Sequence, residues 1–328
     1  MSRTRWILLA IVAVLSVTVG AVASPAKTGK GNDDDKSSKS GKQNGKRSVH
    51  TIPGDAVFPE GIALKGKTFF VSSTTDGTIF KGNTRQSALT SFAPGGADGR
   101  TTAVGLDVSR DRLFVAGGGT GKAWVLSTED GSTLKVLDSV PGGGPTFIND
   151  VEVAGGFAYF TDSQRPIIFR AATSGGTVGD LEPWLDLTGT AFVQQTGFNA
   201  NGITSLKGGR VLAIVQSNTG KLFRIDTKTK AVKEIGLGGA TVTNGDGLEA
   251  HGSRLYVVRN ALNEVAIVKL RKSKSEGRIR DTIKSDLFAF PTTAARDGKR
   301  LLVVNSQFDK RPTANPVLPF TVAAVRLP

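Results

Sequence analysis

Segments in which apolar and polar residues alternate recur throughout residues 51–328, and turns rich in Gly, Asn and Asp separate them. Alternation with a period of two is typical of β-strands, and no amphipathic helical stretch lies between the segments. Each copy of the pattern contains an apolar strand, a Gly-containing turn, a second strand rich in Val, Phe and Tyr, and usually a third strand such as residues 77–81. We therefore expect an all-β fold.

The pattern repeats six times. Its copies begin at Glu60, Val104, Asn149, Asn201, Asp246 and Thr292, at spacings of 44, 45, 52, 45 and 46 residues. A period of about 45 residues corresponds to one four-stranded antiparallel blade of a β-propeller. Six blades fill residues 51–328, so the sequence predicts a six-bladed β-propeller that is closed by pairing of residues 51–57 with the last blade. A β-sandwich is the alternative, but it does not require so regular a spacing.

The first 23 residues have the features of a secretory signal peptide. Arg3 and Arg5 precede an apolar run that ends at Ala23 with the small-residue pattern Ala-Val-Ala. Such a pattern predicts cleavage after Ala23 and a secreted or otherwise extracytoplasmic protein. An uncleaved membrane anchor is the alternative, because the apolar run approaches the length that spans a bilayer.

Residues 24–50 contain seven Lys and Arg, three Asp and almost no large apolar side chain. Such a segment cannot bury enough apolar surface to offset the entropy of ordering, so we expect a disordered basic linker. The linker carries +4 and, with Arg3 and Arg5, the first fifty residues account for +6 of the formal net charge of +14. We prefer a solvated spacer with no nucleic acid partner; contact with an anionic cell-surface polymer is the alternative.

The chain has no cysteine and two histidines, His50 in the predicted linker and His251 in a predicted turn. Disulfides and thiolate metal sites are therefore excluded, and the side chains for a redox metal centre or a Ser–His–Asp hydrolase are lacking. Stability must come from the core of one domain, residues 51–328, which we expect to be a monomer acting on a small molecule.

The residue that opens each copy is expected to lie beside the central channel, because the innermost strand of every blade starts there. Four of these six register residues are polar, namely Glu60, Asn149, Asn201 and Asp246. Buried carboxylates are normally paired or bound to metal, and Val104 and Thr292 supply no cation. Two carboxylates and two amide oxygens fit one divalent metal ion, most closely Ca²⁺, with Mg²⁺, Mn²⁺ or Zn²⁺ as alternatives. Asn and Asp before Gly are also ordinary turn residues, but Glu60 is not a turn former.

The second strand of each blade returns to the same face, and five of these strands end in polar residues: Ser72, Asp162, Gln216, Arg259 and Asn305. We expect the last four, together with Phe147, to contact substrate, with Arg259 facing an anionic group. Phe147, Phe198 and Phe308 are expected to line the cavity. Solvated strand ends and core packing are the alternatives for the polar and aromatic side chains.

With the segments Phe58-Pro-Glu60-Gly, Asn149-Asp, Asn201-Gly and Gly245-Asp246-Gly, the chain resembles the family of senescence marker protein, gluconolactonase and luciferin-regenerating enzyme over residues 55–328. The resemblance implies that Glu60, Asn149, Asn201 and Asp246 bind a divalent cation, commonly calcium, and that Asp246 is the catalytic proton-transferring carboxylate. It implies hydrolysis of a sugar lactone or a related cyclic ester. Sugar-acting members carry an arginine two residues before the blade-three asparagine. Phe147 stands there in this chain and favours a more apolar substrate.

Two other functions stay open. A non-catalytic propeller that binds a ligand or a surface would hydrolyse no ester. A strictosidine-synthase-like enzyme would be expected to carry a catalytic glutamate in its last blade, and the region around Thr292 has none.

Overall fold

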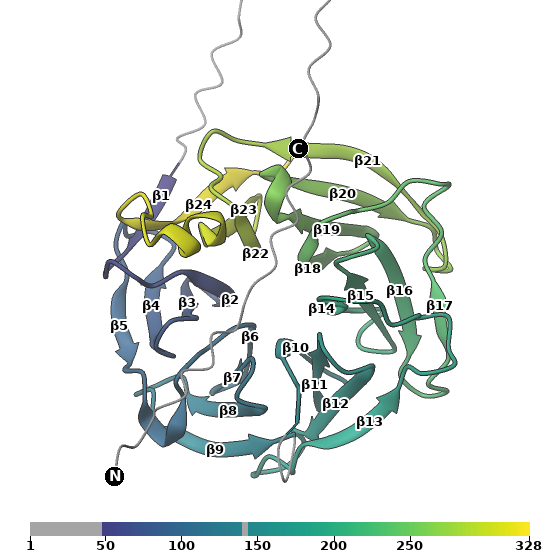
Figure 1. Ribbon diagram of the computed structural model, residues 1–328, viewed down its shortest axis with the longest axis horizontal. Coiled ribbons are helices and arrows are strands. Elements are labelled where there is room, and N and C mark those ends of the chain that lie inside the picture. Colours follow the sequence, from purple (N-terminus) through teal and green to yellow (C-terminus); the bar gives the residue numbers. More distant parts are fainter. Residues whose placement is uncertain (1–47, 140–143) are drawn as a thin grey trace, which may run out of the picture. The chain divides into compact units, whose positions relative to one another are not determined.

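The computed structural model describes residues 48–139 and 144–328. The predicted signal peptide and residues 24–47 of the predicted linker lie outside the described residues. Within the described ranges, 24 strands form six four-stranded sheets arranged in a ring, which confirms the predicted six-bladed β-propeller (Figure 1). The helical elements in these ranges are the short 3₁₀ helices η1 (Ala97–Gly99), η2 (Asn260–Leu262) and η3 (Phe308–Thr313). No helix in these ranges has the length and apolar character needed to cross a membrane.

Five blades are continuous in sequence and antiparallel throughout. Blade 1 contains β2 (Pro59–Lys65), β3 (Thr68–Ser73), β4 (Ile79–Asn83) and β5 (Thr90–Ala93). Blade 2 contains β6 (Leu106–Ser109), β7 (Arg112–Ala116), β8 (Lys122–Ser127) and β9 (Thr133–Asp138). Blade 3 contains β10 (Ile148–Ala154), β11 (Phe157–Asp162), β12 (Ile167–Ala172) and β13 (Glu182–Asp186).

Blade 4 contains β14 (Ala200–Leu206), β15 (Val211–Gln216), β16 (Lys221–Asp226) and β17 (Val232–Glu234). Blade 5 contains β18 (Gly245–His251), β19 (Arg254–Arg259), β20 (Glu264–Leu270) and β21 (Gly277–Lys284). Blade 6 combines β22 (Pro291–Asp297), β23 (Arg300–Asn305) and β24 (Phe320–Arg326) with β1 (Ser48–Ile52) from the other end of the described chain.

The apolar side chains of the strands pack between blades. Six clusters of buried apolar residues fill the six interfaces between neighbouring blades. In the cluster between blades 6 and 1, for example, the rings of Phe69 and Phe320 are fully buried. The middle strands are covered on both faces in this way, which explains why they read as nearly continuous apolar runs.

The innermost strands do not pair regularly with the second strands. In five blades the register shifts at the register residue, for instance between Pro59 and Ile62 in blade 1 and between Ile148 and Val151 in blade 3. Such a β-bulge bends the strand and changes the direction of its side chains. The register residues of these blades therefore lie in bulges where the innermost strands begin.

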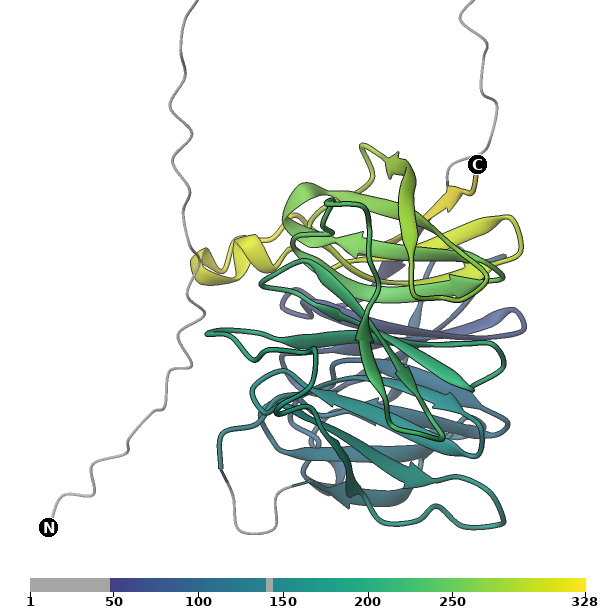
Figure 2. The ribbon, with the colours of Figure 1, turned by 90° about the vertical axis from the view of Figure 1, so that its right-hand side faces the viewer.

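One face of the ring carries the connections that lead into the innermost strands and those that join the second and third strands. We call this the site face. Hydrogen bonds join the two kinds of connection there. Asn218 Nδ2, after β15, donates to the oxygen of Thr196, which precedes β14. The amide of Phe290, which precedes β22, donates to Asn263 Oδ1, after β19. Helix η3, drawn in yellow, projects from this face in Figure 2.

Strand β1 closes the ring. It pairs with β24 from Ser48 to Ile52, and the backbone of Thr51 also exchanges hydrogen bonds with residues 87 and 89 of blade 1. The prediction that residues 51–57 make this contact was wrong in its bounds: the strand begins three residues inside the predicted linker. His50 therefore belongs to the propeller, where it is buried against Phe69 and burial lowers its pKa.

Removal of β1 should open the ring. A chain that starts at residue 53 loses the fully buried Ile52 and the ladder to β24, so its free energy of unfolding should fall by about 3 kcal/mol or more relative to a chain that starts at residue 48. Urea unfolding of the two chains measures the difference. Equal midpoints would show that closure does not depend on β1.

Candidate functional site

The bulges bring the polar register residues to the same end of the central channel. Glu60, Asn149, Asn201 and Asp246 are all buried, with exposed fractions of 4 to 8 %. Burial and, after it, the negative charge of Asp246 raise the pKa of Glu60, and the side chain of Asn201 hydrogen-bonds to Asp246. Asn201 and Asp246 are therefore in contact, and Glu60 lies close enough to Asp246 for their charges to interact.

The glycines after the register residues are required by close packing. A Cβ atom at Gly61 would lie 2.3 Å from the oxygen of Val104, and one at Gly202 would lie 2.2 Å from the oxygen of Asp246. Both positions face the innermost strand of the next blade rather than a turn. The reading of Asn201-Gly202 and Asp246-Gly247 as ordinary turns is therefore wrong, because these pairs lie inside β14 and β18.

Two serines fix the orientation of the asparagine amides. Ser163 Oγ donates to the oxygen of Ala200 at 2.6 Å, so it can only accept from Asn149, whose Nδ2 lies 2.8 Å away. Ser217 Oγ donates in the same way to the oxygen of Gly245 and accepts from Asn201 Nδ2 at 2.9 Å. The serines therefore fix which side of each amide carries the nitrogen, and the oxygen takes the opposite side.

Glu60 carries an unpaired buried atom. Thr293 Oγ1 donates to Glu60 Oε1 at 3.3 Å, whereas Oε2 is buried without a hydrogen-bond partner. Burial is the main reason that the pKa of Glu60 lies well above its ordinary value, and the charges of Asp246 and Asp150 raise it further. A buried carboxylate oxygen without a partner is costly, which is the situation that a bound cation relieves.

Asp246 is held from two sides. Asn260 Nδ2, in η2, donates to Asp246 Oδ2 at 3.1 Å. Burial raises the pKa of Asp246 to about 7, and the hydrogen bonds from Asn260 and Asn201 oppose this rise. In the part of the chain that the structure describes, no three His, Cys, Asp or Glu side chains are grouped so as to hold a metal ion. A cation at this position would therefore depend on the two amide oxygens as well as on Glu60 and Asp246.

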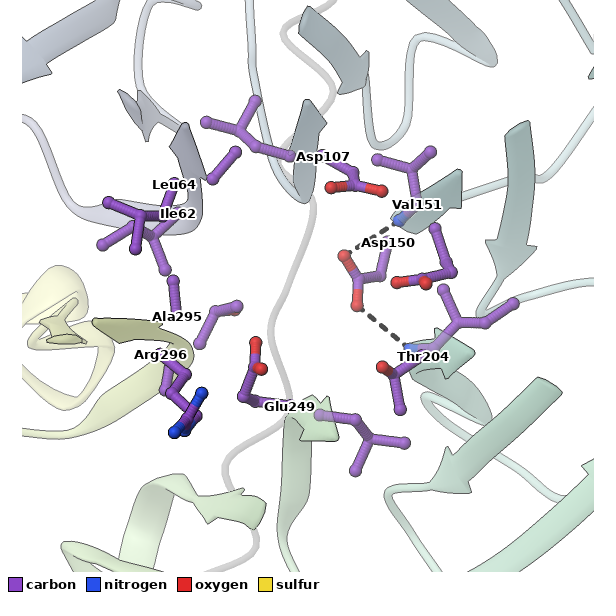
Figure 3. Close-up of a pocket in the computed structure, with 16 residues that line it drawn as sticks. Ile62, Leu64, Asp107, Asp150, Val151, Thr204, Glu249, Ala295 and Arg296 are labelled. Carbon is purple, nitrogen blue, oxygen red and sulfur yellow. Dashed lines mark hydrogen bonds between the residues drawn. The ribbon is translucent and has the colours of Figure 1, made fainter. Parts of the chain in front are cut away.

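Further along the channel lie four carboxylates that the sequence analysis did not single out: Asp107, Asp150, Glu152 and Glu249. They line a cavity of about 200 Å³, and Figure 3 shows Asp107, Asp150 and Glu249 around its interior, with Arg296 on the side of Glu249. Arg296 is the one cationic residue in the lining of this cavity. We call these four residues the channel carboxylates.

Burial is the largest influence on the channel carboxylates. It raises the pKa of Asp107 to about 6, of Asp150 to about 7 and of Glu249 to about 8, and it raises that of Glu152 strongly. Two hydrogen bonds oppose the rise in the pKa of Asp150: its oxygens accept from the amides of Val151 and Ile203, at 2.9 and 3.0 Å. The four channel carboxylates share a place in the repeats, one or three residues after the register residue, and this shared place is the sequence signal that could have identified them.

The outer polar residues hold loops in place. Asp162 is fully buried and accepts hydrogen bonds from Thr146, Phe147, Gln164 and Arg165. Gln216 is hydrogen-bonded to Val193, Asn199 and Thr219. Asn305 is hydrogen-bonded to Leu287, Ala289 and Thr321. These three side chains use their polar atoms inside the fold. We therefore leave them out of the substrate site, contrary to the expectation from sequence.

Arg259 and Phe147 occupy different surroundings. The guanidinium of Arg259 donates to Glu264 Oε1 at 2.6 Å and to the oxygen of Thr243, so it faces an internal carboxylate rather than an open position. Phe147 is half-buried and packs edge-on against Phe198, with 5.0 Å between the ring centroids. Phe308 packs near Phe290 and under the guanidinium of Arg311. The aromatic residues thus stay candidates for the wall of the site.

Comparison with solved structures shows the fold alone. No protein-family model matches the chain. No curated protein matches it in sequence either. The major allergen Mala s 1 of Malassezia sympodialis is 15 % identical, with 86 % of this chain and 96 % of the allergen covered at a TM-score of 0.62.

Two further structures are similar at comparable sequence identity. A catalytically inactive virginiamycin B lyase from Staphylococcus aureus, determined with quinupristin, is 14 % identical over 86 % of this chain and 99 % of the lyase, at a TM-score of 0.55. Nidogen, from a complex with laminin, is 16 % identical over 73 % of this chain and 85 % of nidogen, at a TM-score of 0.54. Proteins of such different kinds share only the propeller, so any function must be argued from the residues of this chain.

Proposed function

We propose that this protein is a metal-dependent hydrolase of a lactone or a related cyclic ester, and that its metal ion is Ca²⁺. The observation that carries the proposal is the set of buried oxygens at one end of the channel: unpaired Glu60 Oε2, the Asp246 carboxylate, and two amide oxygens whose nitrogens are held by serines. Two carboxylates and two neutral oxygens are a ligand set that suits Ca²⁺. The similarity of these residues to the gluconolactonase family supports the same assignment.

In such a reaction a water oxygen bonds to the carbonyl carbon, the ring C–O bond breaks, and a proton moves from water to the leaving oxygen. A bound divalent cation would polarise the carbonyl and acidify the water. Asp246 is the proposed proton carrier, because its carboxylate belongs to the ligand set and Asn260 fixes its orientation. Glu60, Asn149 and Asn201 would hold the cation.

Export rests on residues 1–23, which lie outside the described residues, and stays a proposal. The same holds for contact of the linker with an anionic polymer. A non-catalytic binding propeller is the outcome that would remain if no ester were hydrolysed.

Calcium titration tests the ligand set. Chelator-treated mature protein should bind one Ca²⁺ in calorimetry, and Glu60→Gln should weaken binding about tenfold or more, because the cation then faces one carboxylate instead of two. Glu249→Gln is the matched control, since it makes the same Glu-to-Gln change in the same channel outside the ligand set. No binding of Ca²⁺, Mg²⁺, Mn²⁺ or Zn²⁺ by the parent would overturn the metal site.

Turnover tests the role of Asp246. With Ca²⁺ saturating, Asp246→Asn should lower kcat for lactone hydrolysis about 100-fold or more, because it retains an oxygen ligand but cannot accept the proton. Asn201→Asp keeps an oxygen and adds a charge, so it should retain the metal ion. A parent-like kcat in Asp246→Asn would assign proton transfer to another group.

The channel carboxylates should make stability depend on pH. Glu249 has an ordinary pKa of 4.5 and a pKa of about 8 in the folded state, so between these values the folded protein binds more protons than the unfolded chain. Its contribution to the free energy of unfolding therefore falls as pH rises from 4.5 to 8. Glu249→Gln should be more stable than the parent by a margin that grows by up to about 1.4 kcal/mol per pH unit in this window.

Thermal or urea unfolding at pH 5, 6, 7 and 8 measures this margin. Glu129→Gln is the control, because Glu129 is exposed and has no such environment. A margin for Glu249→Gln that is independent of pH would contradict the raised pKa.

A further inference from the structure

Exposed apolar side chains gather on the site face. Among the described residues, seven large apolar side chains are well exposed, and five of them lie in the connections of this face: Val193, Phe198, Leu262, Val317 and Leu318, with exposed fractions of 40 to 71 %. The other two, Leu134 and Val136, lie on β9, the outermost strand of blade 2. Exposed apolar side chains that gather around one region mark a binding surface more often than scattered ones do.

Two of these side chains, Leu262 and Phe198, lie on segments next to the candidate site. Asn260, which donates to Asp246, and Leu262 belong to the same turn of η2. Phe198 packs on Phe147, which precedes the predicted ligand Asn149 by two residues. Phe198 and Leu262 therefore lie on segments that adjoin the register residues.

The buried polar residues of the site face hold these loops. Gln216 Nε2 donates to the oxygen of Val193, and Gln307 donates to the oxygen of Val317 and accepts from its amide. Asp162 accepts from the amide of Phe147. Each bond fixes the backbone of an apolar residue and consumes a polar side chain that could otherwise have contacted a ligand.

A polyhydroxylated substrate needs donors and acceptors aimed at its hydroxyl groups, because leaving them unpaired on binding is costly. At the four polar positions expected to serve this purpose, Asp162, Gln216, Arg259 and Asn305, the side chains are bonded within the fold. The site face offers apolar contact at Phe147, Phe198 and Leu262 instead.

We propose that the substrate is a lactone or cyclic ester with an alkyl or aromatic substituent, which packs on the apolar side chains of the site face while the ester group reaches the register residues. This inference rests on the proposed function and names the substrate class of the same site. Phe198 is the main contact, because its ring is 40 % exposed and is held edge-on by Phe147.

A homologous series of lactones with alkyl substituents of one to seven carbons tests the inference, with the mature protein saturated with Ca²⁺ and a sugar lactone as comparison. The value of kcat/KM should rise about threefold to fourfold per added methylene until the chain outgrows the surface. The sugar lactone should be at least about 100-fold poorer than the best alkyl lactone. A flat series, or preference for the sugar lactone, overturns the inference and leaves the hydrolase proposal standing.

Variants locate the contact. Phe198→Ser should flatten the dependence on chain length, whereas Leu134→Ser, which removes an apolar side chain that is 52 % exposed on β9, should leave it unchanged. Equal effects of the two variants would contradict the assignment of Phe198. In a second assay, the parent and Phe198→Ser are sedimented with phosphatidylcholine vesicles. Sedimentation of the parent but not of Phe198→Ser, together with a flat lactone series, would assign the surface to lipid and overturn the substrate class.

If no lactone is hydrolysed, the proposed function fails, and alkyl lactams then decide the substrate surface by calorimetry. Binding that strengthens with alkyl length in the parent and weakens in Phe198→Ser supports an apolar ligand on the site face. Absence of lactam binding in the parent overturns it.

Discussion

Six innermost strands approach one axis so closely that a side chain at Gly61 or Gly202 would collide with the backbone of the next blade. This close approach is possible because the ring is closed by β1, which ties blade 6 to blade 1. A bulge lies at the start of the innermost strand in five blades, and the bulges direct the register residues to one end of the channel. The position of the candidate site follows from this packing.

The same packing places carboxylates where water is scarce. Glu60, Asp246 and the channel carboxylates all have raised pKa values, and burial is the largest cause for each. A single arginine lines the cavity beside the channel carboxylates. Charge of this kind costs stability unless it is neutralised, and a protein retains it where a proton or a cation has to be bound. The unpaired oxygen of Glu60 lies at the end of the channel where we propose that a cation binds.

Polar residues on the site face divide into two groups that look alike in sequence. Ser163 and Ser217 hold the amide nitrogens of Asn149 and Asn201 and so fix the orientation of two side chains of the proposed metal site. Asp162 is a strand-end residue of the same polarity, but backbone amides and Arg165 saturate its carboxylate. Sequence position gave no means to separate the two groups, because the difference lies in hydrogen bonds that cross between strands and loops.

The sequence by itself determined the six blades, because a period of about 45 residues is a local property of strand and turn composition. It also determined the common register of Glu60, Asn149, Asn201 and Asp246. The tertiary structure decided the true bounds of the closing strand, since β1 is defined only by its partner β24 some 270 residues away. It also decided which polar atoms are free and revealed Asp150 in the channel, because burial and pairing depend on neighbours from other blades that no single repeat contains.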